Sequence, residues 1–104
     1  MNKALNLLTM CRKAGKLELG MDPSKDACKT FRAKCVIITN DISPNSLKEV
    51  RYVCSDNNIP MMKLDCAGEE IWAALGRKSV VLAVCDAGFS KKLSQMLEAV
   101  DIKA

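Results

Sequence analysis

Two continuous runs of apolar, largely β-branched residues constrain the fold of this chain more than any other feature. They read CVIIT at residues 35–39 and SVVLAVC at residues 79–85. A strand with one solvated face alternates apolar and polar residues, whereas a strand covered on both faces is apolar throughout. Both runs therefore predict central strands with helices packed on each side.

Helical patterns and shorter strands alternate with these two runs. One helix is expected to start with Asp22 as N-cap and Pro23 at its first position, and another repeats this chemistry with Ser43 and Pro44. Apolar spacing predicts further helices over about residues 2–14, 68–76 and 87–100, and further strands over 16–19 and 61–64. This order predicts an α/β fold in one domain over residues 1–104, a three-layer α/β/α sandwich around a mixed sheet of about four strands.

The apolar stripe of each helix is expected to face the sheet. In the helix after Asp22 the stripe comprises Ala27, Cys28 and Phe31. The stripes of the helix after Ser43 and of the last helix comprise Leu47, Val50, Val53 and Cys54, and Phe89, Leu93, Met96, Leu97 and Val100.

The composition argues against an enzyme or a metal site. The chain has no histidine, which removes the usual general base and the commonest transition-metal ligand. Its six cysteines form no Cys-x-x-Cys pair, so we expect reduced, mostly buried thiols and no zinc. The first ten residues do not resemble a secretory signal, and no apolar run approaches the ~20 residues of a membrane span. We therefore expect a cytoplasmic protein without membrane contact or cofactor.

Positive charge is concentrated in the first third of the chain. Residues 1–34 hold eight basic and three acidic side chains, a net charge of +5, whereas the whole chain carries +4. A basic region on a compact domain indicates a polyanionic partner, and it is equally compatible with an ordinary solubilising surface.

Several segments in order resemble one known family. They are CRKAGKLELG (11–20), VIITNDISP (36–44), CSDNNIPMMKL (54–64), EIWAALG (70–76) and VCDAGFSKKL (84–93). Nearly the whole chain is similar to the small ribosomal proteins that bind kink-turn RNA, the seven-Ae and thirty-e type, and most similar to their short bacterial branch. The resemblance implies an α/β/α sandwich that binds structured RNA, often in translation.

The family reads RNA mainly at the start of its second helix, with the pattern Gly-x-Asn-Glu-x-x-Lys. Placed on this chain, the glycine is Gly20, whereas Asp22, Pro23 and Asp26 stand in place of the Asn, Glu and Lys. A carboxylate at residue 22 can only accept hydrogen bonds. Asp26 places negative charge where a phosphate-facing cation is expected, which predicts weaker binding.

Seven residues form the expected RNA-binding set. Gly20 and Met21 would bring backbone close to the RNA, and Asp22 could accept from a guanine amino group. Basic side chains would contact phosphates from the same helix and from the loop after residue 76, where the resemblance implies a second contact surface. These are Lys25, Lys29, Arg77 and Lys78. Lys25 and Lys29 could equally belong to an ordinary solvated helix face.

A different use of the same scaffold remains open from the sequence. The loss of the family's RNA-contacting Asn, Glu and Lys is compatible with a protein-interaction module. Its adaptable exposed patch would comprise Met21, Met61, Met62 and Trp72. Trp72 could also stack on a base, although a lone tryptophan is expected to pack in the fold. A third possibility is an RNA binder without kink-turn specificity. The expected oligomeric state is a monomer.

Overall fold

Helices and strands alternate along the chain, which the computed structural model describes over residues 2–103. The elements in order are α1 (Lys3–Lys13), β1 (Leu17–Leu19), α2 (Met21–Lys29), β2 (Cys35–Ile38), α3 (Pro44–Asn57), β3 (Met61–Lys63), α4 (Gly68–Leu75), β4 (Val81–Val84), α5 (Ala87–Ser94) and β5 (Glu98–Val100). No described helix has the length and apolar character that crossing a bilayer requires.

The strands form one mixed sheet in the order β1-β4-β2-β3-β5. β2 and β3 are parallel, and all other neighbouring pairs are antiparallel. The two continuous apolar runs form β2 and β4, which are adjacent in the sheet and buried along their full length. The expectation of central strands covered on both faces is therefore confirmed.

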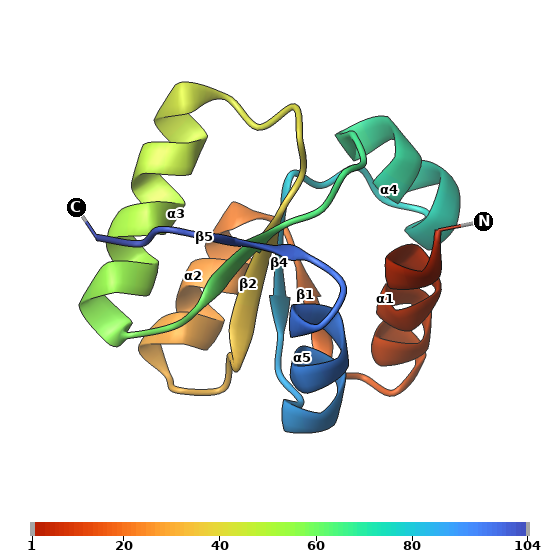
Figure 1. Ribbon diagram of the computed structural model, residues 1–104, viewed down its shortest axis with the longest axis horizontal. Coiled ribbons are helices and arrows are strands. Elements are labelled where there is room, and N and C mark those ends of the chain that lie inside the picture. Colours follow the sequence, from red (N-terminus) through yellow and green to blue (C-terminus); the bar gives the residue numbers. More distant parts are fainter. Residues whose placement is uncertain (1, 104) are drawn as a thin grey trace.

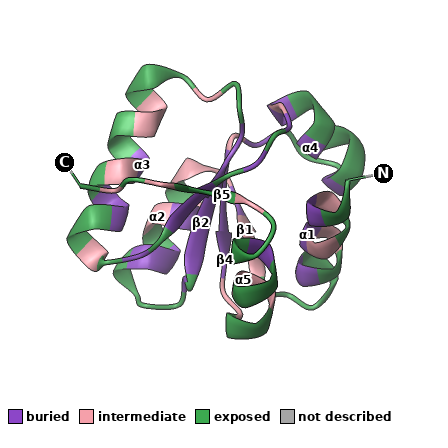
Figure 2. Cartoon of the chain, viewed as in Figure 1, coloured by how far each residue is buried: buried purple, intermediate pink, exposed green. Residues whose placement is uncertain are grey.

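Helices cover both faces of this sheet, as the sequence predicts (Figure 1). Ile37 and Leu82 pack in one core with residues of α1, α4 and α5, and their strand neighbours Val36 and Val81 pack in a second core with α2 and α3. In Figure 2 the buried residues line the sheet and the inward faces of the helices. The expected stripe of α3 is confirmed, with Val50, Val53 and Cys54 buried and Leu47 packed against them.

The expected helix over residues 87–100 is wrong in its second half. α5 ends at Ser94, and β5 then pairs with β3 in an antiparallel ladder, so the sheet has five strands rather than about four. Without β5, the outer edge of β3 would present unpaired backbone groups to solvent. Pairing with β3 therefore outweighs the helical spacing of the apolar residues in this segment, which forms a strand. Met96, expected to face inward, is 49% exposed in the connection, and Val100 reaches the core from a strand.

Phe31 is a second correction, because it does not belong to the stripe of α2. The helix ends at Lys29, and Phe31 follows with a left-handed φ of 60° and is 75% exposed. Ala33 packs in the core after this turn, beside Ala27 and Cys28. Because the chain turns after Lys29, Phe31 does not lie on the sheet-facing side of α2, where the spacing of apolar residues predicted it.

Candidate functional site

Four chain segments meet at the edge of the sheet where α2, α3 and α4 begin. The Gly20 amide donates to the carbonyl oxygen of Val81 at 2.9 Å, and the Thr39 amide donates to that of Val80 at 3.1 Å. The Asn40 amide donates to the carbonyl oxygen of Cys66 at 2.9 Å. Backbone hydrogen bonds thus hold the start of α2 beside the loop that precedes β4.

Gly20 gives the start of α2 its geometry. Its φ of 104° and ψ of 165° lie in a region that is essentially restricted to glycine. Gly20 is the N-cap, so the expectation of Asp22 as N-cap and Pro23 as first helical residue is wrong. The helix begins two residues earlier because the glycine permits the turn directly after β1.

The first turn of α2 has no side-chain cap. Within residues 2–103 no side chain accepts a hydrogen bond from this helix end, and Pro23 has no amide to donate. The amides of Met21 and Asp22 therefore stand at a helix N-terminus, where unpaired donors and the helix dipole favour a negatively charged or acceptor-rich ligand. We call the segment of residues 20–23 the α2 mouth.

Asp41 joins the end of β2 to the start of α4, a role that the sequence reading missed. Its Oδ1 accepts from the Thr39 hydroxyl at 2.7 Å and from the Gly68 amide at 3.0 Å. The Thr39 hydroxyl, followed by the Gly68 amide, holds the pKa of Asp41 below its ordinary value. The position of Asp41 between a buried strand and the Ser43–Pro44 helix start was the available signal, because Asp commonly hydrogen-bonds nearby backbone at such junctions.

Replacing Asp41 by asparagine should produce a stability difference that depends on pH. A pKa lowered by folding means that the ionised form stabilises the fold above the unfolded-state pKa, about 3.9, and that this contribution is lost as the pH falls through the folded-state pKa. We expect Asp41→Asn to unfold at lower urea concentration at pH 7, with the difference from wild type shrinking below about pH 4. Asp56→Asn, on the exposed face of α3, controls for the change in charge. A difference that stays constant across this pH range would contradict the assignment.

The loop before β4 carries two of the predicted cations. Arg77 and Lys78 are exposed, and Lys78 Nζ lies 3.0 Å from Glu69 Oε1. Arg77 has no ion-pair partner within residues 2–103. The structure therefore places Arg77 and Lys78 on the loop that leads into Val81, whose carbonyl holds the α2 mouth.

Lys25 and Lys29 lie elsewhere. Lys25 Nζ is 2.6 Å from Glu49 Oε1 on α3, a contact that raises the pKa of Lys25. Together with Lys29 it lines a groove between α2 and α3. The seven predicted residues thus divide into the α2 mouth with its neighbouring loop, and a pair of lysines that faces α3.

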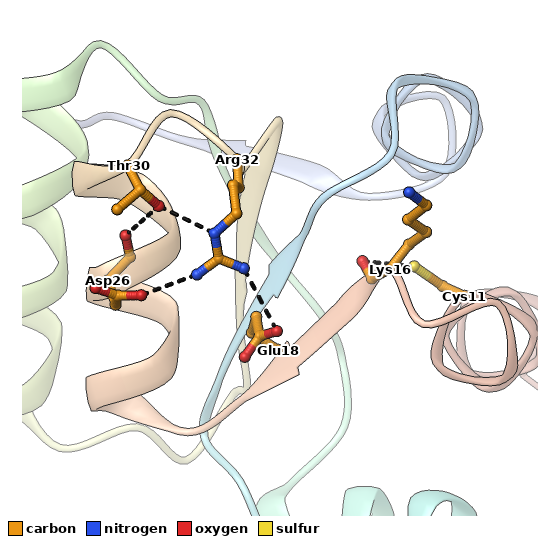
Figure 3. Close-up of polar contacts among 6 residues, drawn as sticks. All are labelled: Cys11, Lys16, Glu18, Asp26, Thr30 and Arg32. Carbon is orange, nitrogen blue, oxygen red and sulfur yellow. Dashed lines mark hydrogen bonds and ion pairs between the residues drawn. The ribbon is translucent and has the colours of Figure 1, made fainter.

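The negative charge of Asp26 is compensated within the protein (Figure 3). Arg32 Nη2 lies 2.9 Å from Asp26 Oδ2, and Arg32 Nη1 lies 3.6 Å from Glu18 Oε1. Arg32 Nε also donates to the Thr30 hydroxyl at 3.0 Å. Sequence reading treated Asp26 as a free charge facing the ligand, because the turn that returns Arg32 to it is not visible in a helical projection.

The patch expected for a protein-interaction module is mostly absent. Met61 and Met62 are buried in the two cores, and Met21 is partly buried against the second. Trp72 does not pack in the fold as expected, since it is 57% exposed on α4. One exposed tryptophan therefore remains from the expected four-residue surface.

The cysteines are free and behave as core residues. Cys85 is half-buried and the other five are buried. Burial above all raises the pKa of Cys11 to about 12 and that of Cys35 to about 11. These thiols stay protonated at neutral pH, and a protonated thiol is neither a nucleophile nor a metal ligand. Within residues 2–103 no group of His, Cys, Asp or Glu is arranged to hold a metal ion.

Comparison with protein families gives a match over residues 2–94, to the ribosomal protein L7Ae/L30e/S12e/Gadd45 family. Two curated relatives carry the name RNA-binding protein YlxQ. The one from Enterococcus faecium is 32% identical over 96 residues, which is 92% of each chain. The one from Bacillus subtilis strain 168 is 32% identical over 93 residues, covering 88% of this chain and 92% of the relative. These descriptions agree with the expectation of a protein that is not an enzyme.

Solved structures show the same fold. A protein of unknown function from Bacillus halodurans C has a TM-score of 0.84 at 28% identity, covering 92% of this chain and 97% of its own. A Giardia lamblia 15.5 kD RNA-binding protein has a TM-score of 0.73 at 16% identity, covering 88% and 79%, and this likeness supports the fold alone.

Proposed function

Because the chain belongs to the ribosomal protein L7Ae/L30e/S12e/Gadd45 family, we propose that it binds structured RNA of the kink-turn type through the α2 mouth. The name shared by the relatives from Enterococcus faecium and Bacillus subtilis supports RNA as the ligand class. The description of the family as ribosomal proteins supports a partner in translation, either the ribosome or an RNA that acts with it.

The uncapped helix start behind Gly20 is the observation that carries this proposal. Met21 and Asp22 supply backbone amides at the positive end of the helix dipole, and Gly20 lets the chain approach a ligand closely. The Asp22 carboxylate accepts hydrogen bonds, so it would take one from a guanine amino group in the sheared G·A pairs of the kink. Arg77 and Lys78 would contact phosphates and so orient the RNA.

The compensation of Asp26 supports RNA binding at the α2 mouth. Its ion pair with Arg32 at 2.9 Å directs positive charge toward the carboxylate that replaces the family's lysine. Glu69 is similarly paired with Lys78 at 3.0 Å. These partners reduce the repulsion that the nearby carboxylates would exert on phosphate.

A titration at low salt tests this function. A kink-turn RNA is compared with a control duplex of the same length in which Watson–Crick pairs replace the sheared G·A pairs. We expect the kink-turn RNA to bind at least tenfold more tightly, a difference of about 1.4 kcal/mol, because the amides and Asp22 read the kinked geometry. Affinity should fall with salt in proportion to the phosphates contacted. No binding to either RNA at low salt would reject the proposal.

A protein-interaction module is the second candidate function of this chain. The 57% exposure of Trp72 on α4 is the observation that favours it. Equal, weak binding of both RNAs would instead indicate an RNA binder without kink-turn specificity. Trp72→Ala separates the two functions, because it should abolish capture of a protein partner by an interaction module and should leave the affinity for kink-turn RNA unchanged if the α2 mouth is the RNA site.

A further inference from the structure

A groove of about 670 Å³ lies between α2 and α3, and we call it the α2–α3 groove. The helices pack side by side over one face of the sheet (Figure 1). Lys25 and Lys29 line the groove from α2, Lys48, Arg51 and Tyr52 line it from α3, and Lys103 lines it from the C-terminal segment. Nothing in the proposed α2 mouth accounts for this second concentration of cations.

The α2–α3 groove carries an excess of positive charge that the fold does not neutralise. Its two acids are Glu49 and Asp56, and Glu49 is paired with Lys25 at 2.6 Å. The other four cations have no ion-pair partner within residues 2–103.

An exposed aromatic ring lies among these cations. Tyr52 is 66% exposed at the α2–α3 groove, and it is the single tyrosine of the chain. Single-stranded nucleic acid is typically bound by a basic groove that follows the backbone together with aromatic rings on which bases stack. An acidic peptide would use the cations and would have no need of the ring.

The first groove residue of α2, Lys25, follows closely on the proposed RNA site in the same helix. Both helices begin at the sheet edge that holds the α2 mouth, and Lys25 lies one turn of helix beyond Met21. The lining residues of α3 extend from Asn45 to Asn57. At 1.5 Å per residue this is roughly 18 Å, the length of a few nucleotides.

We infer that the α2–α3 groove binds a single-stranded RNA segment that extends from the structured RNA held at the α2 mouth. Lys29, Lys48, Arg51 and Lys103 contact its phosphates, and Tyr52 stacks on a base. The inference rests on the proposed function, to which it adds a second contact surface and a requirement for unpaired nucleotides beside the kink.

The test compares a minimal kink-turn RNA with the same RNA carrying a single-stranded extension of about eight nucleotides, attached at either end. For the wild-type protein we expect one of the extensions to raise affinity about tenfold. Tyr52→Ala should remove most of this gain. The pair Lys48→Gln and Lys103→Gln should reduce it and lower the salt slope by about 1.4. All of these variants should bind the minimal RNA as the wild type does.

Matched controls separate this surface from general charge. The pair Lys91→Gln and Lys92→Gln removes two cations from α5, on the other face of the sheet, and should leave the gain intact. The inference is overturned if neither extension increases affinity, or if the gain survives both groove variants. Stronger binding of an acidic peptide of equal charge than of the extension sequence would also overturn it.

A separate arm keeps the two proposals distinguishable. The extension sequence is titrated alone, as a dye-labelled single-stranded oligonucleotide whose fluorescence anisotropy reports binding to the wild type and to Tyr52→Ala alike. Binding that Tyr52→Ala abolishes supports the α2–α3 groove even if the minimal kink-turn RNA fails to bind and the proposed function is wrong. Absence of binding at low salt counts against the α2–α3 groove whatever happens at the α2 mouth.

Discussion

Gly20→Val is expected to lower the affinity for kink-turn RNA by about 100-fold, close to 2.7 kcal/mol. The space for a side chain is not the obstacle, because a Cβ at residue 20 would lie 3.7 Å from Pro23 Cδ. The obstacle is the backbone, since φ of 104° with ψ of 165° is very unfavourable for a β-branched residue. Valine would force this segment into another conformation and displace the first-turn amides from the α2 mouth.

Gly15→Val is the matched control for this variant. Gly15 also has a positive φ, 73°, and a Cβ there would meet no atom within 4 Å. Both variants should lose about 1–3 kcal/mol of unfolding free energy from backbone strain. Only Gly20→Val should lose RNA affinity once both proteins are assayed well below their melting temperatures. Equal losses of affinity would show that the α2 mouth is not the contact.

Leu82→Ala should cost about 2–5 kcal/mol of unfolding free energy. Leu82 is fully buried on β4, where it pairs with Leu19 on β1 and with Ile37 on β2. Removing its side chain leaves a cavity between the sheet and the core that includes α1, α4 and α5. Urea denaturation measures the loss through the midpoint at an unchanged slope.

Trp72→Ala provides the contrasting substitution for stability. It removes a larger side chain from an exposed position of α4, so its effect should stay within about 0.5 kcal/mol. A loss below about 1 kcal/mol for Leu82→Ala would contradict the packing described for the central strands. A loss of several kcal/mol for Trp72→Ala would show that this ring packs in the fold after all.

The fold could be predicted largely from local patterns because its central strands are covered on both faces. The runs CVIIT and SVVLAVC indicate buried strands from their own composition, without information on the rest of the fold. Ser43 caps α3 as the sequence predicts, and its hydroxyl accepts from the Ser46 amide at 3.2 Å. β5 could not be predicted in this way. Its residues fit a helical stripe, and the free edge of β3 that makes them a strand is a feature of the assembled sheet.

The site could be predicted only as separate pieces. Gly20, Asp22, Arg77 and Lys78 were identified along the sequence, but the hydrogen bond between Gly20 and Val81 that relates the α2 mouth to the loop before β4 joins segments about 60 residues apart. A helical projection predicts that Lys25 lies beside the RNA-binding surface at the start of α2. In the structure its ion pair with Glu49 directs the Lys25 side chain toward α3.

The charge around the α2 mouth is determined by which side chains form ion pairs, and the number of basic and acidic residues in the sequence does not predict it. The +5 charge of residues 1–34 suggested one basic surface. The structure divides it, because Arg32 is engaged by Asp26 and Glu18 while Lys25 and Lys29 face the α2–α3 groove. The α2 mouth therefore depends on backbone amides more than on side-chain cations. Four cations without an ion-pair partner within residues 2–103 line the α2–α3 groove instead.

Amide chemical shifts recorded while kink-turn RNA is added test the central claim most directly. If RNA binds at the α2 mouth, the largest changes should fall on the amides of Met21 and Asp22, accompanied by Arg77 and Lys78 in the loop before β4. If those four amides stay unchanged at saturation while the signals around Trp72 on α4 shift, the RNA binds elsewhere and the account is contradicted.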